Sequence, residues 1–206
     1  MEHPSSNAVR TSREALAQLH LEAEAILRDV PLRDVSVVDL PGGGAGRTLA
    51  DIKALLGARE VEAGGAVVRS LFALRWLLGR LFGWDAARAG HGAQSYLHRL
   101  DPALKARSLV APGTPDGPFQ ILYQFDRESL AEIQNATVHA FLSTALVPTA
   151  LGYRLYWAVY VKPVSWLSPV YMALIEPFRR WIVYPSLLRR LRRAWQARHF
   201  SVSSAS

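Results

Sequence analysis

Hydrophobic positions in the first half of the chain recur every three or four residues, which is the period of an amphipathic helix. This period predicts helices over residues 12–27, 48–56 and 67–82, with Thr48 opening the second. The first of them is interpreted either as a helix or as an arm that folds on a partner. Between the first two, the valine-rich residues 35–40 are followed by Pro41 and predict a strand.

From residue 95 onward, hydrophobic and polar residues alternate, which is the period of a strand. The turn-forming residues 148–152 separate two such runs and predict an antiparallel hairpin. In the second strand of this hairpin we expect one packed face and one amphipathic face, the latter with Arg154, Tyr156, Tyr160 and Lys162. The runs predicted as strands are residues 95–100, 119–125, 137–147 and 153–162.

Helices are also predicted around these strands. The Asp-Pro pair at 101–102 begins a short helical turn, and the Ser-Pro pair at 168–169 begins a long terminal helix. Pro177 and Pro185 predict kinks or a break in that helix. The order of elements predicts an α+β fold, in which a curved antiparallel sheet wraps the C-terminal helix and the N-terminal helices are additional.

Composition then limits the kind of protein. The chain has 206 residues, 50% of them hydrophobic, which is enough for one substantial core. We expect a single domain over residues 13–198, between disordered tails at 1–12 and 199–206. The absence of cysteine excludes disulfides, thiolate zinc sites and cysteine nucleophiles. Residues 1–12 lack the apolar core of a signal peptide, which predicts a cytoplasmic protein. The uncharged residues 133–153 are interrupted by polar side chains and are interpreted as the hairpin rather than a membrane span.

The positive charge of the chain is concentrated at its end. The last thirty residues hold seven arginines and no acid, which equals the formal net charge of +7. An apolar stripe shares this segment, so we expect a terminal helix packed on the core with a solvated outer face. Contact with an anionic membrane is the alternative, whereas a nucleic-acid partner is not expected. The candidate membrane-contact residues are Arg189, Arg190, Arg192, Arg193 and Trp195.

Two motifs that often bind cofactors are weak in this chain. The glycine run at residues 42–46 leaves three residues between its outer glycines, and Arg47 replaces the Walker lysine, so we expect a flexible turn and not a nucleotide site. No two of the six histidines have the helical spacing that brings two ligands to one metal. We therefore expect neither a metal nor a cofactor.

A few polar residues lie within apolar segments and are candidates for chemistry. His98 and His139 fall in predicted strands, where a histidine facing a cavity donates a hydrogen bond or a proton, although a structural role is the usual one. The acids nearest the apolar segments are Asp126, Glu128, Glu132 and Glu176. No serine occupies a nucleophile-elbow motif.

The C-terminal half also resembles a known family. The segments that carry the resemblance are residues 135–141 (Asn-Ala-Thr-Val-His-Ala-Phe), 152–160 (Gly-Tyr-Arg-Leu-Tyr-Trp-Ala-Val-Tyr) and 171–183. They resemble an uncharacterised bacterial domain-of-unknown-function family near the START-like (SRPBCC, helix-grip) superfamily. The resemblance implies a curved sheet that grips a long C-terminal helix, with a cavity for apolar molecules, and it carries over no catalytic residue.

Three hypotheses follow for the function. The first is non-catalytic binding or transport of a small hydrophobic ligand in the cavity between sheet and helix. The second is an enzyme of the polyketide cyclase or isomerase type, with His139 as base and Tyr123 or Glu176 as acid. The third is a membrane-surface protein that docks through its arginine-rich helix. The sequence leaves the oligomeric state open. The candidate ligand-binding residues are Phe119, Tyr123, His139, Phe141, Trp157 and Met172, with His139 or Glu176 as the polar anchor.

Overall fold

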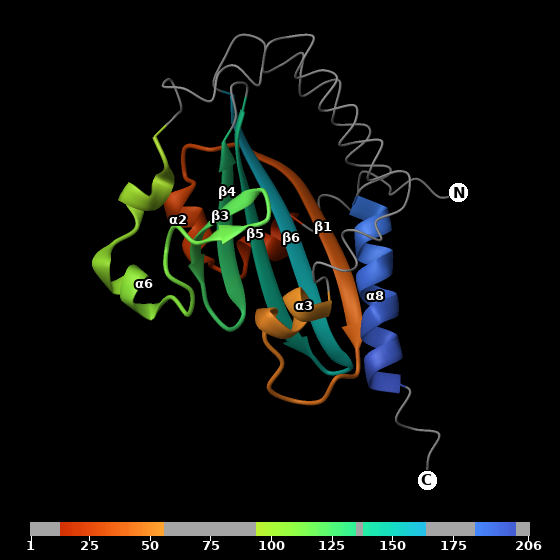
Figure 1. The fold of residues 1–206 in the computed structure, drawn as a ribbon. Helices are drawn as coiled ribbons and strands as arrows, with labels where there is room; N and C mark the ends of the chain where they lie inside the picture. Colours follow the sequence, from red (N-terminus) through yellow and green to blue (C-terminus); the bar gives the residue numbers. More distant parts are fainter. Residues whose placement is uncertain (1–12, 56–93, 135–137, 164–183, 201–206) are drawn as a thin grey trace. The chain divides into compact units, whose positions relative to one another are not determined.

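A curved antiparallel sheet of six strands is the centre of the fold (Figure 1). The computed structural model describes residues 13–55, 94–134, 138–163 and 184–200. The strand order is β1-β6-β5-β4-β3-β2, so β2 to β6 follow one another across the sheet and β1 adds to the far edge beside β6. The strands are β1 (Leu32–Pro41), β2 (Pro115–Asp116), β3 (Phe119–Gln124), β4 (Glu128–Gln134), β5 (Val138–Thr149) and β6 (Gly152–Pro163).

The predicted hairpin is confirmed as β5 and β6, with its turn at residues 150–151. The predicted strand at residues 35–40 is confirmed as the centre of β1, which pairs with β6 so that Val38 lies opposite Leu155. Strand β4 is not predicted from the pattern. Glu128, Leu130 and Glu132 occupy alternate positions of β4 and therefore share one face, on which Leu130 is buried. Because this face mixes polar and apolar residues, the sequence lacks the alternation that marks a strand.

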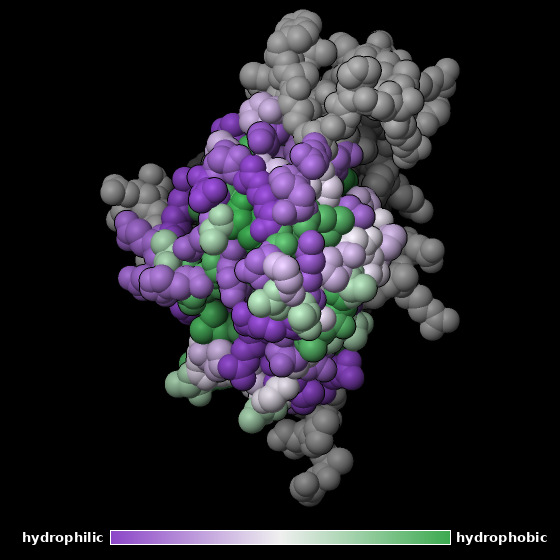
Figure 2. Space-filling model, turned by 90° about the vertical axis from the view of Figure 1, so that its left-hand side faces the viewer, coloured by the Kyte–Doolittle hydropathy of each residue, from purple (hydrophilic) through white to green (hydrophobic). Residues whose placement is uncertain are grey.

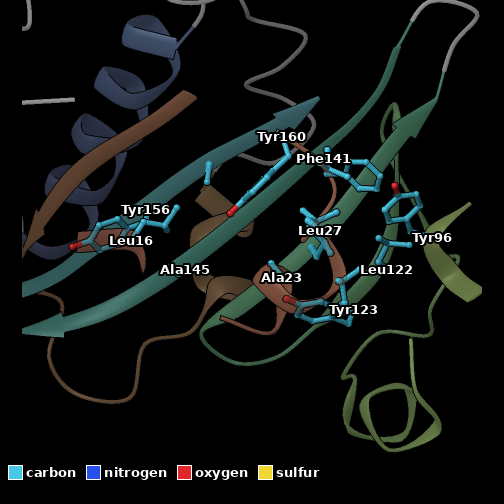
Figure 3. Close-up of a cluster of buried hydrophobic side chains, with 14 of the residues drawn as sticks. Leu16, Ala23, Leu27, Tyr96, Leu122, Tyr123, Phe141, Ala145, Tyr156 and Tyr160 are labelled. Atoms are coloured by element: carbon cyan, nitrogen blue, oxygen red, sulfur yellow. The ribbon is translucent and has the colours of Figure 1, made fainter. Parts of the chain in front are cut away.

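Both faces of β6 are buried, which corrects the expectation of one packed and one amphipathic face. Leu155 and Val161 are buried on one face, and Tyr156 and Tyr160 are buried on the other. The second face packs against the N-terminal segment and the segment of residues 95–107, which contribute Leu16, Ala23, Leu27 and Tyr96 to the same cluster (Figure 3). Because these segments exclude water, the tyrosine rings belong to the core rather than to the surface.

Short helices pack against the face of the sheet that carries Tyr156 and Tyr160. They are α2 (Glu22–Ile26), the 3₁₀ helix η2 (Tyr96–Arg99) and α6 (Pro102–Arg107). The helix predicted at residues 12–27 is interrupted near His20, whose φ is 49°, between a helical stretch at residues 13–17 and α2. The predicted turn after residue 101 is confirmed as α6, where the Asp101 carboxylate accepts the Leu104 N–H at 2.6 Å.

The expected strand at residues 95–100 is wrong, because this segment forms η2 instead. The Ser95 hydroxyl oxygen accepts the N–H of Leu97 at 3.2 Å, and the Tyr96 N–H donates to the Glu132 carboxylate at 3.1 Å. These bonds satisfy backbone donors at the start of a helical turn, so no neighbouring strand is needed. Tyr96 and Leu100 are both buried, and their apolar side chains produced the pattern in the sequence that predicted a strand.

The chain forms two compact units. The first contains the sheet with α2, η2 and α6, and the second contains most of α3 (Leu49–Leu55), residues 134–139 and α8 (Tyr184–Phe200). Helix α3 confirms the prediction at residues 48–56, apart from its last residue, which lies outside the description. The helix expected at residues 67–82 and the start of the terminal helix at 168–169 also lie outside the described residues. The single domain over residues 13–198 stays a prediction.

No described helix combines the length and the apolar character that crossing a membrane requires.

Candidate functional site

The structure separates the predicted ligand-binding residues onto different parts of the fold. Tyr123 and Phe141 belong to the buried cluster beneath α2 and η2, where the Phe141 and Tyr96 rings lie 4.5 Å apart between centroids (Figure 3). Phe119 is half-buried at the start of β3, opposite Asp116 of the edge strand. Trp157 lies on the opposite face of the sheet, since its strand neighbour Tyr156 faces the cluster. Met172 and Glu176 lie outside the described residues.

A buried carboxylate holds the hydroxyl of Tyr123. Glu128 accepts a hydrogen bond from Tyr123 Oη and a second one, at 3.2 Å, from the N–H of Ala23 in α2. Burial raises the pKa of Glu128 above its ordinary value, against the opposing effect of these two donors. Burial also raises the pKa of Tyr123 well above 10.0, so this tyrosine stays protonated and donates. The pair therefore ties the β3–β4 turn to α2.

A second buried carboxylate stabilises η2. Glu132 is only 1% exposed, and it accepts from the Ser95 hydroxyl and from the N–H of Tyr96. Each carboxylate oxygen of Glu132 accepts one of these two donors, which come from a segment distant in the sequence. The two hydrogen bonds offset the cost of removing the carboxylate from water. Glu128 and Glu132 therefore have structural roles. The sequence identifies them as acids near apolar segments but does not show which donors they bind.

His139 is fully buried at the start of β5. Its Nε2 lies 3.2 Å from the side-chain nitrogen of Gln134, the last residue of β4. This contact joins the two ends of the β4–β5 connection. The hypothesis of an enzyme requires His139 to converge with Tyr123 or Glu176. The described contacts engage the Tyr123 hydroxyl with Glu128 instead, and Glu176 lies outside the described residues.

The face of β6 that carries Trp157 has an unsatisfied polar group. Leu155 and Val161 are buried on this face, whereas the Trp157 side chain is partly exposed. Its indole N–H is buried and has no acceptor among the residues that the structure describes. On the same face, the hydroxyls of Ser129 and Thr144 satisfy each other at 2.6 Å. Among the described residues, the Trp157 indole N–H is therefore a buried donor without a partner, which is unusual in folded proteins.

A comparable group lies on the opposite face of the sheet. The Ser143 hydroxyl is buried and makes no hydrogen bond within the described segments. It belongs to the row of β5 residues that includes Phe141 and Ala145, both members of the buried cluster. Segments α2 and η2 contribute Ala23, Ile26 and Tyr96 to that cluster, so Ser143 belongs to the covered face of the sheet.

An open cleft of about 600 Å³ lies between α2 and α6 and is strongly charged. Asp29 accepts from Arg99 Nη2 at 2.9 Å and lies 3.5 Å from Lys162 Nζ. The Arg99 guanidinium holds the pKa of Asp29 well below its usual value. The same guanidinium lies 3.8 Å above the Tyr96 ring. On this side of the molecule, hydrophobic residues form separate patches among hydrophilic ones (Figure 2). Asp29, Arg99 and Lys162 are therefore already paired with one another, which makes this cluster a structural feature of the cleft.

A second cleft, of about 460 Å³, lies between the glycine-rich residues 42–46 and the β5–β6 turn. Tyr153 Oη accepts from the N–H of Arg47 at 3.0 Å and donates to the carbonyl of Gly44 at 2.9 Å. Arg47 Nε donates to the carbonyl of Gly43 at 2.6 Å. The run expected to be a flexible turn is therefore held to β6 by a buried tyrosine.

Residues 26–186 match the model of a family described as proteins of unknown function, DUF2867. The chain belongs to the DUF2867 family. No curated protein matches the chain. The DUF2867 match spans all six strands and confirms the expected domain-of-unknown-function family. It ends within the first turn of α8, so the arginine-rich part of that helix follows the DUF2867 segment.

The four arginines of α8 proposed for membrane contact are exposed. The fifth candidate, Trp195, is fully buried, as is Leu191 one turn earlier, and the Trp195 ring lies 4.4 Å from that of His199 between centroids. The helix therefore has a basic face and a buried apolar face. The exposed arginines are Arg189, Arg190, Arg192 and Arg193.

Within the described segments, no three histidine or acidic side chains gather as a metal site requires.

Proposed function

We propose that this DUF2867 protein binds a small apolar molecule against the Trp157 face of its sheet and catalyses no reaction. The observation that carries the proposal is the buried indole N–H of Trp157, which has no acceptor among the described residues. A buried donor left unsatisfied costs about 1–3 kcal/mol. A ligand with one carbonyl or hydroxyl oxygen would recover that cost and would take its orientation from this single bond.

The surroundings of Trp157 favour an apolar ligand. Its neighbours on the same face of β6, Leu155, Val159 and Val161, are buried aliphatic side chains. The nearest polar pair on that face, Ser129 and Thr144, is already satisfied. An apolar wall with one oriented donor is the usual design of a small-molecule site, in which burial supplies affinity and the hydrogen bond supplies direction. The likeness to START-like helix-grip proteins, which agrees with this design, is part of the proposal.

Binding is favoured over the cyclase or isomerase hypothesis. A general acid must reach its substrate, yet the Tyr123 hydroxyl is buried and donates to Glu128. Burial also raises the pKa of Tyr123 well above its ordinary value, which opposes proton transfer at neutral pH.

Docking to an anionic membrane through α8 is a second candidate, favoured by the exposure of its four arginines. The burial of Trp195 makes this contact electrostatic, so it must weaken with added salt. The measurement is sedimentation with anionic vesicles, comparing the intact chain with a chain truncated after Tyr184. Equal binding of the two chains contradicts membrane docking.

The ligand proposal is tested by native mass spectrometry of the gently purified full chain and by titration with the neutral apolar probe N-phenylnaphthylamine. We expect a co-purified small molecule and saturable binding of the probe. Trp157→Phe keeps an aromatic ring, although a smaller one, and removes the donor, so it should reduce the occupancy of the co-purified molecule by roughly tenfold. Tyr156→Phe, on the other face of the same strand, is the matched control and should leave occupancy unchanged.

Two results would overturn the proposal. One is a wild-type chain that carries no added mass and shows no saturable probe binding. The other is an equal loss of the co-purified molecule in Trp157→Phe and Tyr156→Phe, because such a loss would reflect a general loosening of β6.

A further inference from the structure

The cleft at the glycine-rich loop combines backbone N–H donors with a positive charge, and neither has a partner among the residues that the structure describes. Its lining comes from Gly42 and residues 44–46 on one side and from residues 148–153 around the β5–β6 turn on the other. Arg127 is the charged side chain in that lining. Arg127 is exposed and makes no ion pair or hydrogen bond through its side chain within the described part of the chain. A guanidinium in this state is available to a ligand.

Peptide groups of the loop supply the other donors. Gly44, Ala45 and Gly46 line the cleft, and among the described residues no acceptor bonds to their N–H groups. The carbonyl of Gly44, in contrast, is satisfied by the Tyr153 hydroxyl. Successive free N–H groups in a loop form a concave site for anions. The Gly44 carbonyl is thus bonded to Tyr153 of β6, whereas the N–H groups of residues 44–46 have no acceptor among the described residues.

The loop is positioned before a ligand arrives. Tyr153 is buried and bonds to both the N–H of Arg47 and the carbonyl of Gly44. Arg47 adds a bond from Nε to Gly43, which keeps its positive charge beside the loop. Arg47 and Arg127 together line a neighbouring cleft of about 480 Å³ that shares Gly46 and also contains Asp126 and Glu128. Binding therefore needs little ordering of the loop, which lowers its entropic cost.

We propose that this cleft binds the phosphate group of a small molecule. Three peptide N–H groups and a guanidinium fork match the several acceptor oxygens of a phosphate, and Arg pairs with phosphate through two parallel bonds. The Walker spacing that the loop lacks is not required, because Arg127 comes from the β3–β4 turn rather than from the glycine run. Leu151, which is 82% exposed at the rim, gives the rest of the ligand an apolar contact.

The test is an amide NMR titration of the full chain with inorganic phosphate and with methyl phosphate, at constant ionic strength. We expect saturable shifts of the Gly44, Ala45 and Gly46 amide signals. Arg127→Gln should weaken binding by roughly tenfold, since it removes one charge-assisted contact. Arg189→Gln on α8 removes the same charge from an exposed site and should leave the affinity unchanged.

Vesicles that contain phosphatidic acid identify the source of the phosphate. Binding to vesicles that depends on Arg127, stronger than binding of methyl phosphate, assigns a lipid headgroup, and the reverse order assigns a soluble phosphate ester. The proposal is overturned when neither phosphate nor vesicles shift the three amide signals. It is also overturned when Arg127→Gln and Arg189→Gln weaken binding equally, because net charge then explains the effect.

Discussion

Single residues show how this fold accommodates polar groups in its interior. Glu128 and Glu132 are inward-facing carboxylates on β4, and each is satisfied by donors from a segment far away in the sequence. Tyr123 completes the bonding of Glu128. From the sequence, these acids are recognisable only as acids near apolar segments. Their roles depend on the N–H groups of Ala23 and Tyr96, whose positions follow from tertiary packing.

The raised pKa of Glu128 predicts a pH-dependent stability. Because its folded pKa lies above the ordinary 4.5, ionised Glu128 is less favourable in the folded than in the unfolded chain. The contribution of this group is therefore fully present below pH 4.5 and is lost as the pH rises through the folded pKa. Urea unfolding of Glu128→Gln should show a smaller loss between acidic and neutral pH than wild type. The exposed Glu14→Gln should follow wild type, and a Glu128→Gln profile parallel to wild type would contradict the assignment.

At the scale of elements, the β5–β6 hairpin is the most predictable part of the chain. Its alternation and its turn residues are local, so the sequence pattern places both strands correctly. Its contact with the glycine-rich loop is not local. Gly152 begins β6 opposite Pro41, and a Cβ added there lies 2.5 Å from the carbonyl of Leu40 and 2.6 Å from the nitrogen of Gly42.

Gly152→Ala is expected to destabilise the protein by about 3 kcal/mol, because it combines an unfavourable φ of +144° with a clash against backbone atoms that cannot move freely. Gly117→Ala is the matched control, since φ there is +59° and an added Cβ meets nothing within 4 Å. That control should cost only about 1 kcal/mol, from backbone strain alone. The measurement is the free energy of unfolding in urea. An equal loss of unfolding free energy in the two variants would show that the glycine-rich loop moves to accommodate the added Cβ without a clash.

At the scale of the whole molecule, a charged cluster joins three distant segments of the sheet unit. Asp29 follows α2, Arg99 belongs to η2, and Lys162 lies near the end of β6. The three charges meet beside the Tyr96 ring, to whose hydroxyl Lys162 donates at 3.2 Å. No local pattern brings residues separated by 70 positions together. The cluster can therefore form only when these three segments of the sheet unit have folded together.

Asp29→Asn should flatten the acid side of the stability profile. Arg99 lowers the pKa of Asp29 below its ordinary 3.8, so the stabilisation is present above pH 3.8 and is lost as the pH falls through the folded pKa. Urea unfolding below about pH 4 should therefore show a smaller loss for the variant than for wild type. Asp34→Asn on β1, which has no ion pair within the described residues, is the control. Identical acid profiles for wild type and Asp29→Asn would contradict the role of this cluster.

The sequence by itself determined the α+β class, the hairpin, the cap of α6 and the position of α3, because period, turns and caps act between residues a few positions apart. The tertiary structure decided that residues 96–99 form a helical turn, that β4 is a strand and that both faces of β6 are buried. It also placed Trp157 on the face opposite Tyr123 and Phe141, and it brought Arg127 to the glycine-rich loop. These features depend on which distant segments exclude water from a residue or supply its hydrogen-bond partners, and neither is encoded in local alternation.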